Sequence, residues 1–366
     1  MSKISEIDKN LAVSDTVSEN GLIFRNSLSA PFSLYGLLPV TPFLRFPLET
    51  AKKVNPGVEG LCRNTAGGRL RFKTNSKRVV LRVCYDEISP MPHMPLTGST
   101  GFDAYIAADG KYSYAGSFIP PIGCGNNFDS EIVLPDNAMR DITINFPLYN
   151  SVKTVFIGLE ENAELIKTDG YTDYKPIVYY GSSITQGGCA SRPGNSYQAL
   201  ISRRFNLDYF NFGFSGSARG EKAMADYIAD MPMSLFFLDY DHNSPDPEHL
   251  KAHHEKFFLT VREKNPDLPV IMATKTDIPR SPDAERDTAA RRRAVYETYE
   301  NALKRGDRNV MFIDGGTVFT EALNLTAPAD SCTVDGCHPN DLGFACMAKV
   351  YGDARKHMLG LIYHSI

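Results

Sequence analysis

Two patterns of apolar and polar residues divide the chain. From about residue 20 to 170, apolar and polar positions alternate in short segments, and this period of two predicts β-strands. Turn-forming residues such as those at 66–68 separate the segments, and no long helical period appears. The pattern predicts an all-β sandwich, jelly-roll-like. The strand candidates are 70–74, 79–84, 102–106, 112–116, 142–146 and 154–159.

In the second half, almost continuous apolar runs alternate with segments of helical period. This alternation predicts an α/β fold, a parallel sheet covered by helices on both faces. In such sheets the functional site lies beyond the carboxyl ends of the strands. The strand candidates are 177–180, 209–212, 235–238, 270–273 and 310–313, and the helical candidates are roughly 196–205, 219–230, 247–264, 284–305 and 341–358.

The change of pattern predicts two domains. A chain of 366 residues is long for a single core. The segment 169–173 is polar, and Pro176 follows three residues after it. We therefore predict an N-terminal sandwich domain at 1–172 and a catalytic α/β domain at 173–366.

Composition and charge argue against several function classes. The net charge is −4, so nothing favours nucleic acid or an anionic membrane as a partner. No run of about 18 apolar residues is present. Seven cysteines, an odd number without Cys-x-x-Cys spacing, argue against a disulfide framework or a zinc knuckle. The first residues lack an apolar signal core, and together these features predict a cytoplasmic protein. No phosphate loop, dinucleotide fingerprint or metal cluster is found, so neither cofactor nor metal is expected.

Candidate chemistry begins at the end of the first apolar strand of the second half. Gly181 permits a sharp turn there, and Ser183 follows it. A Gly-Ser-Ser turn is also common without any chemical role. Much later, Asp335 precedes His338 by three residues, so the carboxylate can hold one imidazole nitrogen and leave the other as a base toward a hydroxyl. The alternative is the start of a helix, with Asn340 near its cap.

Two further strand ends carry hydrogen-bond donors. After the second strand, Gly216 or Gly213 can direct a backbone N–H into a site, as an oxyanion hole requires. After the third strand, Asn243 offers a side-chain amide for the same oxyanion. Each segment also fits an ordinary tight loop.

Taken in chain order, the segments of Ser183, Gly216, Asn243 and the Asp335–His338 pair resemble the four sequence blocks of the SGNH (GDSL-like) hydrolase family. The fold of that family is three-layered and flavodoxin-like. The resemblance covers about residues 175 to 360. It implies Ser183 as nucleophile, Asp335 and His338 as its partners, and an oxyanion hole from Ser183, Gly216 and Asn243. Gly216 fits the usual Asn-x-x-x-x-Gly spacing, counted from Asn211. The family's usual Gly-Asp-Ser has Ser182 in place of Asp, a change that concerns support of the turn.

Residues 101–105, Gly-Phe-Asp-Ala-Tyr, are similar to the Gly-x-Asp-Leu-Tyr element of two-domain SGNH proteins, with Ala104 replacing Leu. This subgroup implies a carbohydrate esterase that removes acetyl groups. We therefore expect a serine esterase acting on a small-molecule or oligosaccharide ester. Two alternatives stay open: an acyltransferase with the same triad, and a non-catalytic carbohydrate-binding protein. Oligomeric state is also left open, a homo-oligomer included.

Three other segments have less specific patterns. The apolar loop 91–98 is predicted either to pack between the domains or to line the pocket for the acyl group or the sugar. The pair His253 and His254 is expected on an exposed helix face. The run 291–293, three arginines near acidic residues, is expected to form a salt-bridged helix surface.

Overall fold

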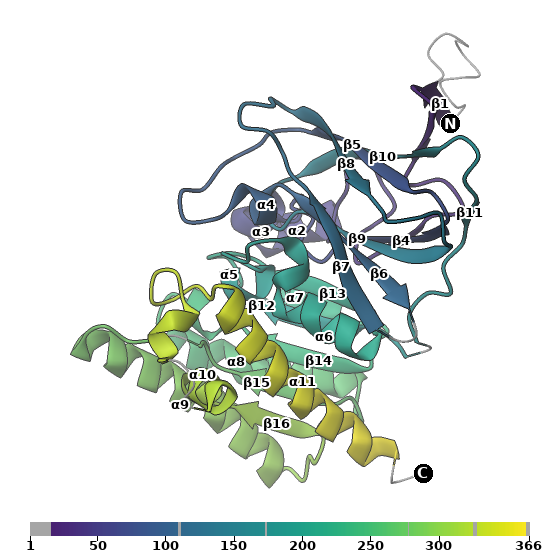
Figure 1. Ribbon diagram of the computed structural model, residues 1–366. Helices are drawn as coiled ribbons and strands as arrows, with labels where there is room; N and C mark the ends of the chain where they lie inside the picture. Colours follow the sequence, from purple (N-terminus) through teal and green to yellow (C-terminus); the bar gives the residue numbers. More distant parts are fainter. Residues whose placement is uncertain (1–15, 109–110, 173, 277, 325–327, 364–366) are drawn as a thin grey trace.

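The computed structural model describes residues 16–108, 111–172, 174–276, 278–324 and 328–363. Two parts follow one another along the chain (Figure 1). Antiparallel strands extend to Ile166, and a parallel sheet with helices begins at Ile177. The predicted domain boundary falls in the segment between them, where residue 173 lies outside the described residues.

The first part is a sandwich of two antiparallel sheets, as predicted. One sheet has the order β1-β2-β10-β5-β8; the other has the order β11-β4-β9-β6-β7, with β3 paired to β4. Side chains from both sheets, such as Phe72, Val83 and Ile157, form one buried core. The strands are β1 (Thr16–Glu19), β2 (Leu22–Asn26), β3 (Ser33–Tyr35), β4 (Arg69–Thr74), β5 (Arg78–Tyr85), β6 (Phe102–Ala108), β7 (Lys111–Phe118), β8 (Asn127–Val133), β9 (Arg140–Asn145), β10 (Val152–Glu160) and β11 (Leu165–Ile166).

Some elements of this part were not predicted. Strand β8 buries only Phe128 and Ile132 and otherwise consists of polar or exposed positions, so its alternation is weak. Three short helices also occur, and each is too short to show a helical period. They are α2 (Leu48–Val54), α3 (Pro56–Leu61) and α4 (Leu96–Ser99).

The second part is a parallel sheet in the order β13-β12-β14-β15-β16. This order is that of flavodoxin-like folds. All five predicted strands and all five predicted helices are present, and α5 and α10 are additional helices. The strands are β12 (Ile177–Gly181), β13 (Tyr209–Gly213), β14 (Leu235–Asp239), β15 (Val270–Ala273) and β16 (Val310–Ile313). The helices are α5 (Ser183–Gln186), α6 (Tyr197–Phe205), α7 (Lys222–Ala229), α8 (Pro247–Lys264), α9 (Pro282–Lys304), α10 (Gly315–Leu323) and α11 (Asp341–Tyr363), with 3-10 turns η2 (Pro193–Asn195), η3 (Asp241–Asn243) and η4 (Ala329–Cys332).

Side chains of the parallel strands alternate between two helical layers. Val178 and Tyr180 pack into the core formed with α7, α8 and α9. Ile177 and Tyr179 pack into the core formed with α6, α10 and α11. Both faces of the sheet are therefore covered, which explains the continuous apolar runs in the sequence. Among the described residues, no helix is both long and apolar enough to cross a membrane.

Two buried arginines from the sandwich cover the edge of this sheet. β13 is an edge strand, and an uncovered edge exposes unpaired backbone groups. Arg69 donates to the carbonyl of Tyr209 at 3.0 Å. Arg45 donates to the carbonyls of Asn211 at 3.1 Å and Gly213 at 2.5 Å. These three alternate carbonyls lie along one side of β13, so the sandwich supplies the partners that a sixth strand would otherwise provide.

Candidate active site

The turn after β12 holds Ser183 at the start of α5. A side chain at Gly181 would place its Cβ 2.1 Å from the carbonyl oxygen of Asp239, so glycine is required there. Ser182 caps the helix, because its Oγ accepts the backbone N–H of Ile184 at 3.2 Å. The serine that replaces the usual aspartate thus supports the turn.

The structure brings Ser183, His338 and Asp335 together in one hydrogen-bonded chain. Ser183 Oγ lies 3.0 Å from His338 Nε2, and His338 Nδ1 lies 2.8 Å from Asp335 Oδ2. Asp335 Oδ1 accepts the backbone N–H groups of Cys337 at 2.9 Å and His338 at 2.7 Å. Burial would raise the pKa of Asp335, but the hydrogen bonds from the His338 backbone and ring outweigh it and lower the pKa to about 2. The carboxylate therefore stays ionised beside the imidazole.

The helix-start interpretation of this segment also holds. Helix α11 begins at Asp341, and Asn340 Oδ1 accepts the N–H of Gly343 at 3.1 Å. Gly336 has φ of 82°, which closes the tight turn between the acid and the base. The cap and the Asp335–His338 pair therefore occupy neighbouring positions of one loop.

The turn after β13 presents Gly216 with φ of 65° and open space where a side chain would be. No hydrogen-bond acceptor for its N–H is found among the described residues. The competing residue, Gly213, donates its N–H to Asn211 Oδ1 at 2.9 Å, so that N–H is already used. The neighbouring Ser215 N–H donates to Gln186 Oε1 at 3.1 Å and ties this turn to α5. The geometry thus favours Gly216 over Gly213 as an oxyanion donor.

Asn243 lies on η3, and its amide nitrogen donates to the carbonyl of Phe214 at 2.9 Å. One of its two amide hydrogens remains for an oxyanion. The loop is held by Arg291, which donates to the carbonyls of Asp241 at 2.7 Å and Ser244 at 2.9 Å. Arg291 is paired with Asp287 at 2.7 Å, as predicted, but it is only 6% exposed, so the predicted surface position is wrong for this residue. The sequence showed only a charged run, because the carbonyls that it contacts are distant in sequence.

The sandwich also contacts the nucleophile turn, through residues that the sequence did not indicate. Tyr149 donates its hydroxyl to the carbonyl of Ser183 at 3.1 Å. The carbonyl of Leu148 accepts the side-chain amide of Gln186 at 3.1 Å. Burial raises the pKa of the Tyr149 phenol, which therefore remains a proton donor. Nothing in the sequence around an isolated tyrosine marks such a contact.

The loop 91–98 lies beside the same site. The ring of His93, an exposed residue, lies 5.8 Å from the His338 ring between centroids. Met94 is buried in the core that contains Ile184 and Cys189. Both alternatives for this loop are thus represented, since Met94 packs between the two parts and His93 borders the candidate site.

His254 and the group formed by Asp335, Cys337 and His338 offer further polar atoms for chemistry. His254 is 1% exposed and bonds Thr298 Oγ1 through Nδ1 at 2.8 Å. Burial lowers its pKa to about 4, so the predicted solvated histidine is a neutral core residue instead. Among the described residues, ligand atoms of Asp335, Cys337 and His338 lie within 4.8 Å of one another, close enough to hold a metal ion. Asp335 and His338 are already hydrogen-bonded to each other there.

Two family models match the chain, one over each part. Residues 174–355 match the GDSL-like lipase/acylhydrolase family. The chain belongs to this family. Residues 24–165 match the N-terminal domain of SGNH-hydrolase-type esterases, so both resemblances inferred from the sequence are confirmed. Membership of this hydrolase family supports an esterase or related hydrolase activity.

Solved structures resemble both parts of the chain. A GDSL-like lipase from Bacteroides ovatus is 29% identical, with a TM-score of 0.84, covering 93% of this chain and 98% of its own. A salicylyl-acyltransferase from a tetracycline biosynthetic pathway is 21% identical, with a TM-score of 0.74, covering 94% and 98%. A family two carbohydrate esterase from Clostridium thermocellum, in complex with cellohexaose, is 14% identical, with a TM-score of 0.56, covering 81% and 94%. The acyltransferase and the carbohydrate esterase share the fold of this chain. No curated protein sequence matches the chain.

Proposed function

We propose that this protein is a serine esterase that removes small acyl groups, acetyl above all, from carbohydrates. The observation that carries the proposal is the continuous hydrogen-bonded chain from Ser183 Oγ through His338 to Asp335. A hydroxyl, an imidazole and an ionised carboxylate in this order form a nucleophile with its base and orienting group.

In the proposed reaction, Ser183 Oγ attacks the ester carbonyl carbon while His338 Nε2 takes the hydroxyl proton. Asp335 holds the opposite ring nitrogen and stabilises the imidazolium. The N–H groups of Ser183 and Gly216 and the amide of Asn243 bind the oxyanion. His338 then gives its proton to the departing alcohol oxygen. Water, activated by the same imidazole, releases the carboxylic acid and restores Ser183.

The preference for a small acyl group rests on the contribution of the sandwich to the site. Loop 91–98 and Tyr149 border the nucleophile turn from the sandwich side. We expect these neighbours to leave too little room at Ser183 for a long acyl chain, so short esters should react faster. The cellohexaose complex of the structurally similar Clostridium thermocellum esterase makes a carbohydrate a reasonable alcohol component.

The test is a comparison of purified protein on nitrophenyl acetate, nitrophenyl octanoate and an acetylated xylo-oligosaccharide. The proposal predicts much faster turnover of both acetyl esters than of the octanoate. Faster octanoate turnover contradicts the short-acyl proposal. Absence of turnover on all three contradicts the esterase and favours the non-catalytic carbohydrate-binding alternative.

An acyltransferase is the second candidate, because a salicylyl-acyltransferase shares the fold over nearly the full chain. In that reaction an alcohol replaces water in the second half, and the triad has the same roles. Measuring how the acyl group is divided between water and an added alcohol separates the two. Free acid as the main product supports the esterase, and transfer to the alcohol as the main product supports the transferase.

A further inference from the structure

A second cavity lies at the opposite end of the parallel sheet from Ser183. It has a volume of about 410 Å³ and is lined by strands β4, β6, β7 and β9 and by Asn206. Asn206 lies three residues before the start of β13, whereas Ser183 lies two residues after the end of β12, which runs parallel to β13. The cavity is therefore separated from the candidate active site by the length of a strand. Its volume is within the range of small-molecule sites, about 300–1,000 Å³.

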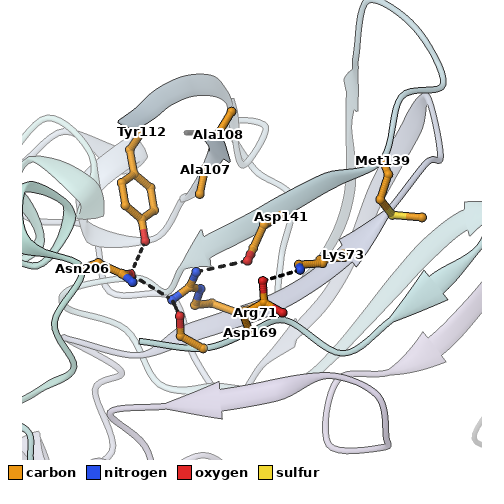
Figure 2. Close-up of a pocket in the computed structure, with 10 residues that line it drawn as sticks. Arg71, Lys73, Ala107, Ala108, Tyr112, Met139, Asp141, Asp169 and Asn206 are labelled. Atoms are coloured by element: carbon orange, nitrogen blue, oxygen red, sulfur yellow. Dashed lines mark hydrogen bonds and ion pairs between the residues drawn. The ribbon is translucent and has the colours of Figure 1, made fainter. Parts of the chain in front are cut away.

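The charged groups of this cavity are balanced and held in place (Figure 2). Arg71 lies 3.3 Å from Asp141, and Lys73 lies 2.5 Å from Asp169. Arg71 is 2% exposed, donates to the carbonyl of Gly170 at 2.8 Å, and its guanidinium lies over a tyrosine ring. Two cations face two carboxylates, so the cavity carries no excess charge that would attract an ion.

Several polar groups of the cavity retain hydrogen-bonding capacity. Among the described residues, Arg71 Nε and Asp141 Oδ1 have no partner, but both atoms are fully covered by protein and cannot contact a ligand in the cavity. Asn206 Oδ1 accepts from the Tyr112 hydroxyl at 2.6 Å and from Arg71 at 3.4 Å. This leaves the Asn206 amide hydrogens for another acceptor. A ligand that carries hydroxyls can accept these amide hydrogens and donate to the Tyr112 hydroxyl oxygen.

The other walls of the cavity are apolar. They are formed by Ala107, Ala108, Met139 and the ring of Tyr112. Figure 2 shows Tyr112 directed toward Asn206, and Asp141 and Asn206 directed toward Arg71, from different elements. Carboxylate, amide and phenol groups beside an apolar wall complement a molecule that carries hydroxyls on its edge and C–H bonds on its face.

We propose that this cavity is a second binding site, for a neutral saccharide, distinct from the candidate active site. An anionic ligand would have to displace Asp141 or Asp169 from its cation, and a lipid would have to cover four charged side chains without pairing them. A neutral sugar ring neither displaces a carboxylate from its cation nor leaves the charged side chains without polar partners. Its hydroxyls donate and accept, and its C–H face packs against Tyr112 and Met139.

The test uses isothermal titration calorimetry of the full chain with cellobiose, xylobiose and inorganic phosphate. Asn206 has φ of 50°, a left-handed conformation, so Asn206→Gly removes its side chain without backbone strain. Asn324→Gly is the matched control, because Asn324 has φ of 46° at the end of α10, outside the lining of the cavity. Tyr112→Phe removes only the hydroxyl. Turnover of nitrophenyl acetate is measured in parallel.

The proposal predicts that at least one disaccharide binds, that Asn206→Gly raises its Kd at least tenfold, and that Tyr112→Phe raises it as well. Asn324→Gly should bind like the wild type, and acetate turnover should be unchanged in all three variants. Binding of neither disaccharide overturns the proposal. It is also overturned if Asn206→Gly binds like Asn324→Gly, or if phosphate binds more tightly than the disaccharides and depends on Asn206.

Discussion

The carbonyl oxygen of Ser183 accepts three hydrogen bonds. Two come from the backbone N–H groups of Gly187 at 3.1 Å and Gly188 at 2.8 Å. The third comes from the Tyr149 hydroxyl at 3.1 Å. Because the first two belong to the same turn, Tyr149 is the contact that ties this carbonyl to the sandwich, next to the bond between the Gln186 amide and the Leu148 carbonyl. It positions the nucleophile without touching the reacting atoms.

Tyr149→Phe should therefore lower kcat on acetate esters by roughly fivefold, the equivalent of about 1 kcal/mol for one lost hydrogen bond. KM should change little, because no substrate contact is removed. Tyr114→Phe is the control, since Tyr114 is 51% exposed on β7. Steady-state kinetics of both variants test this, and an unchanged kcat in Tyr149→Phe would show that the backbone donors alone fix the turn.

At this scale, the sequence indicated residues with characteristic spacing and missed those defined only by tertiary contacts. Asp335 and His338 were predictable as a pair because three residues separate them within one turn. Ser183 and Asn243 were predictable as strand-end residues of one sheet. Tyr149 and Arg291 were not, because each acts on carbonyl groups that lie far away in the sequence.

At the scale of elements, α9 positions the loop of Asn243, the proposed oxyanion donor. Arg291 reaches from this helix to both ends of η3, and it is also paired with Asp287 at 2.7 Å. Arg291→Met keeps the apolar stem but leaves the carbonyls of Asp241 and Ser244 without their donor. Each unpaired buried group costs about 1–3 kcal/mol.

We expect Arg291→Met to lower kcat at least roughly tenfold. The upper bound is the loss of a whole oxyanion donor, which lowers kcat about 10²–10³-fold. Arg293→Met is the control, because its side chain is 60% exposed on the same helix. Kinetics are measured well below the midpoint of thermal unfolding of each variant. Equal kcat values for the two variants, both folded, would contradict a positioning role.

Strand β6 carries a buried acid, Asp103, which contacts the second part of the molecule and makes the stability of the fold depend on pH. Asp103 accepts the N–H of Gly194 at 2.9 Å and the amide of Asn145 at 2.8 Å. Burial outweighs these hydrogen bonds and raises the pKa of Asp103 from 3.8 to about 6. Between these two values the folded state binds the proton more tightly than the unfolded chain. The contribution of Asp103 to stability therefore falls as pH rises from about 4 to 6.

Asp103→Asn removes this titration. We expect the difference in the free energy of unfolding, wild type minus variant, to decrease between about pH 4 and 6 and to stay constant above about pH 7. Urea unfolding followed by circular dichroism at several pH values measures it. A constant difference over the whole range would show that the carboxyl group titrates alike in the folded and unfolded chain.

The strands that are clearest in the sequence are those whose side chains are buried on both faces of a sheet. The five strands of the parallel sheet are covered on both faces, so each appeared as an apolar run in the sequence. Strand β8, with two buried residues out of seven, gave no clear signal. Helix α10 starts with Gly315 and Gly316, which are more typical of a turn than of a helix.

At the scale of the whole molecule, the sandwich covers an edge strand and part of the apolar core of the second part. Arg45 and Arg69 provide the hydrogen bonds for the outer side of β13, and Phe46 packs into the core beside Phe212 and Phe214. Without the sandwich, β13 would become an exposed edge next to a bared apolar surface. Such edges pair with other chains and aggregate.

The isolated fragment 175–366 should accordingly be poorly soluble or weakly active on nitrophenyl acetate. Size-exclusion chromatography and acetate turnover, compared with the full chain, measure the two properties. Restoring activity by adding the separately produced residues 1–172 would support the edge-covering role. A soluble fragment with full activity would show that the sandwich is not needed to build the site.

The central claim is that Ser183 is the nucleophile, and the most direct measurement compares Ser183→Ala with its neighbour Ser182→Ala on nitrophenyl acetate. Removing the nucleophile of a triad lowers kcat by several orders of magnitude, up to about 10⁶-fold. Ser182 contributes only a helix-capping hydrogen bond, worth about 1 kcal/mol. We therefore predict a folded and nearly inactive Ser183→Ala and a mildly impaired Ser182→Ala. An active Ser183→Ala beside an inactive Ser182→Ala would contradict the assignment.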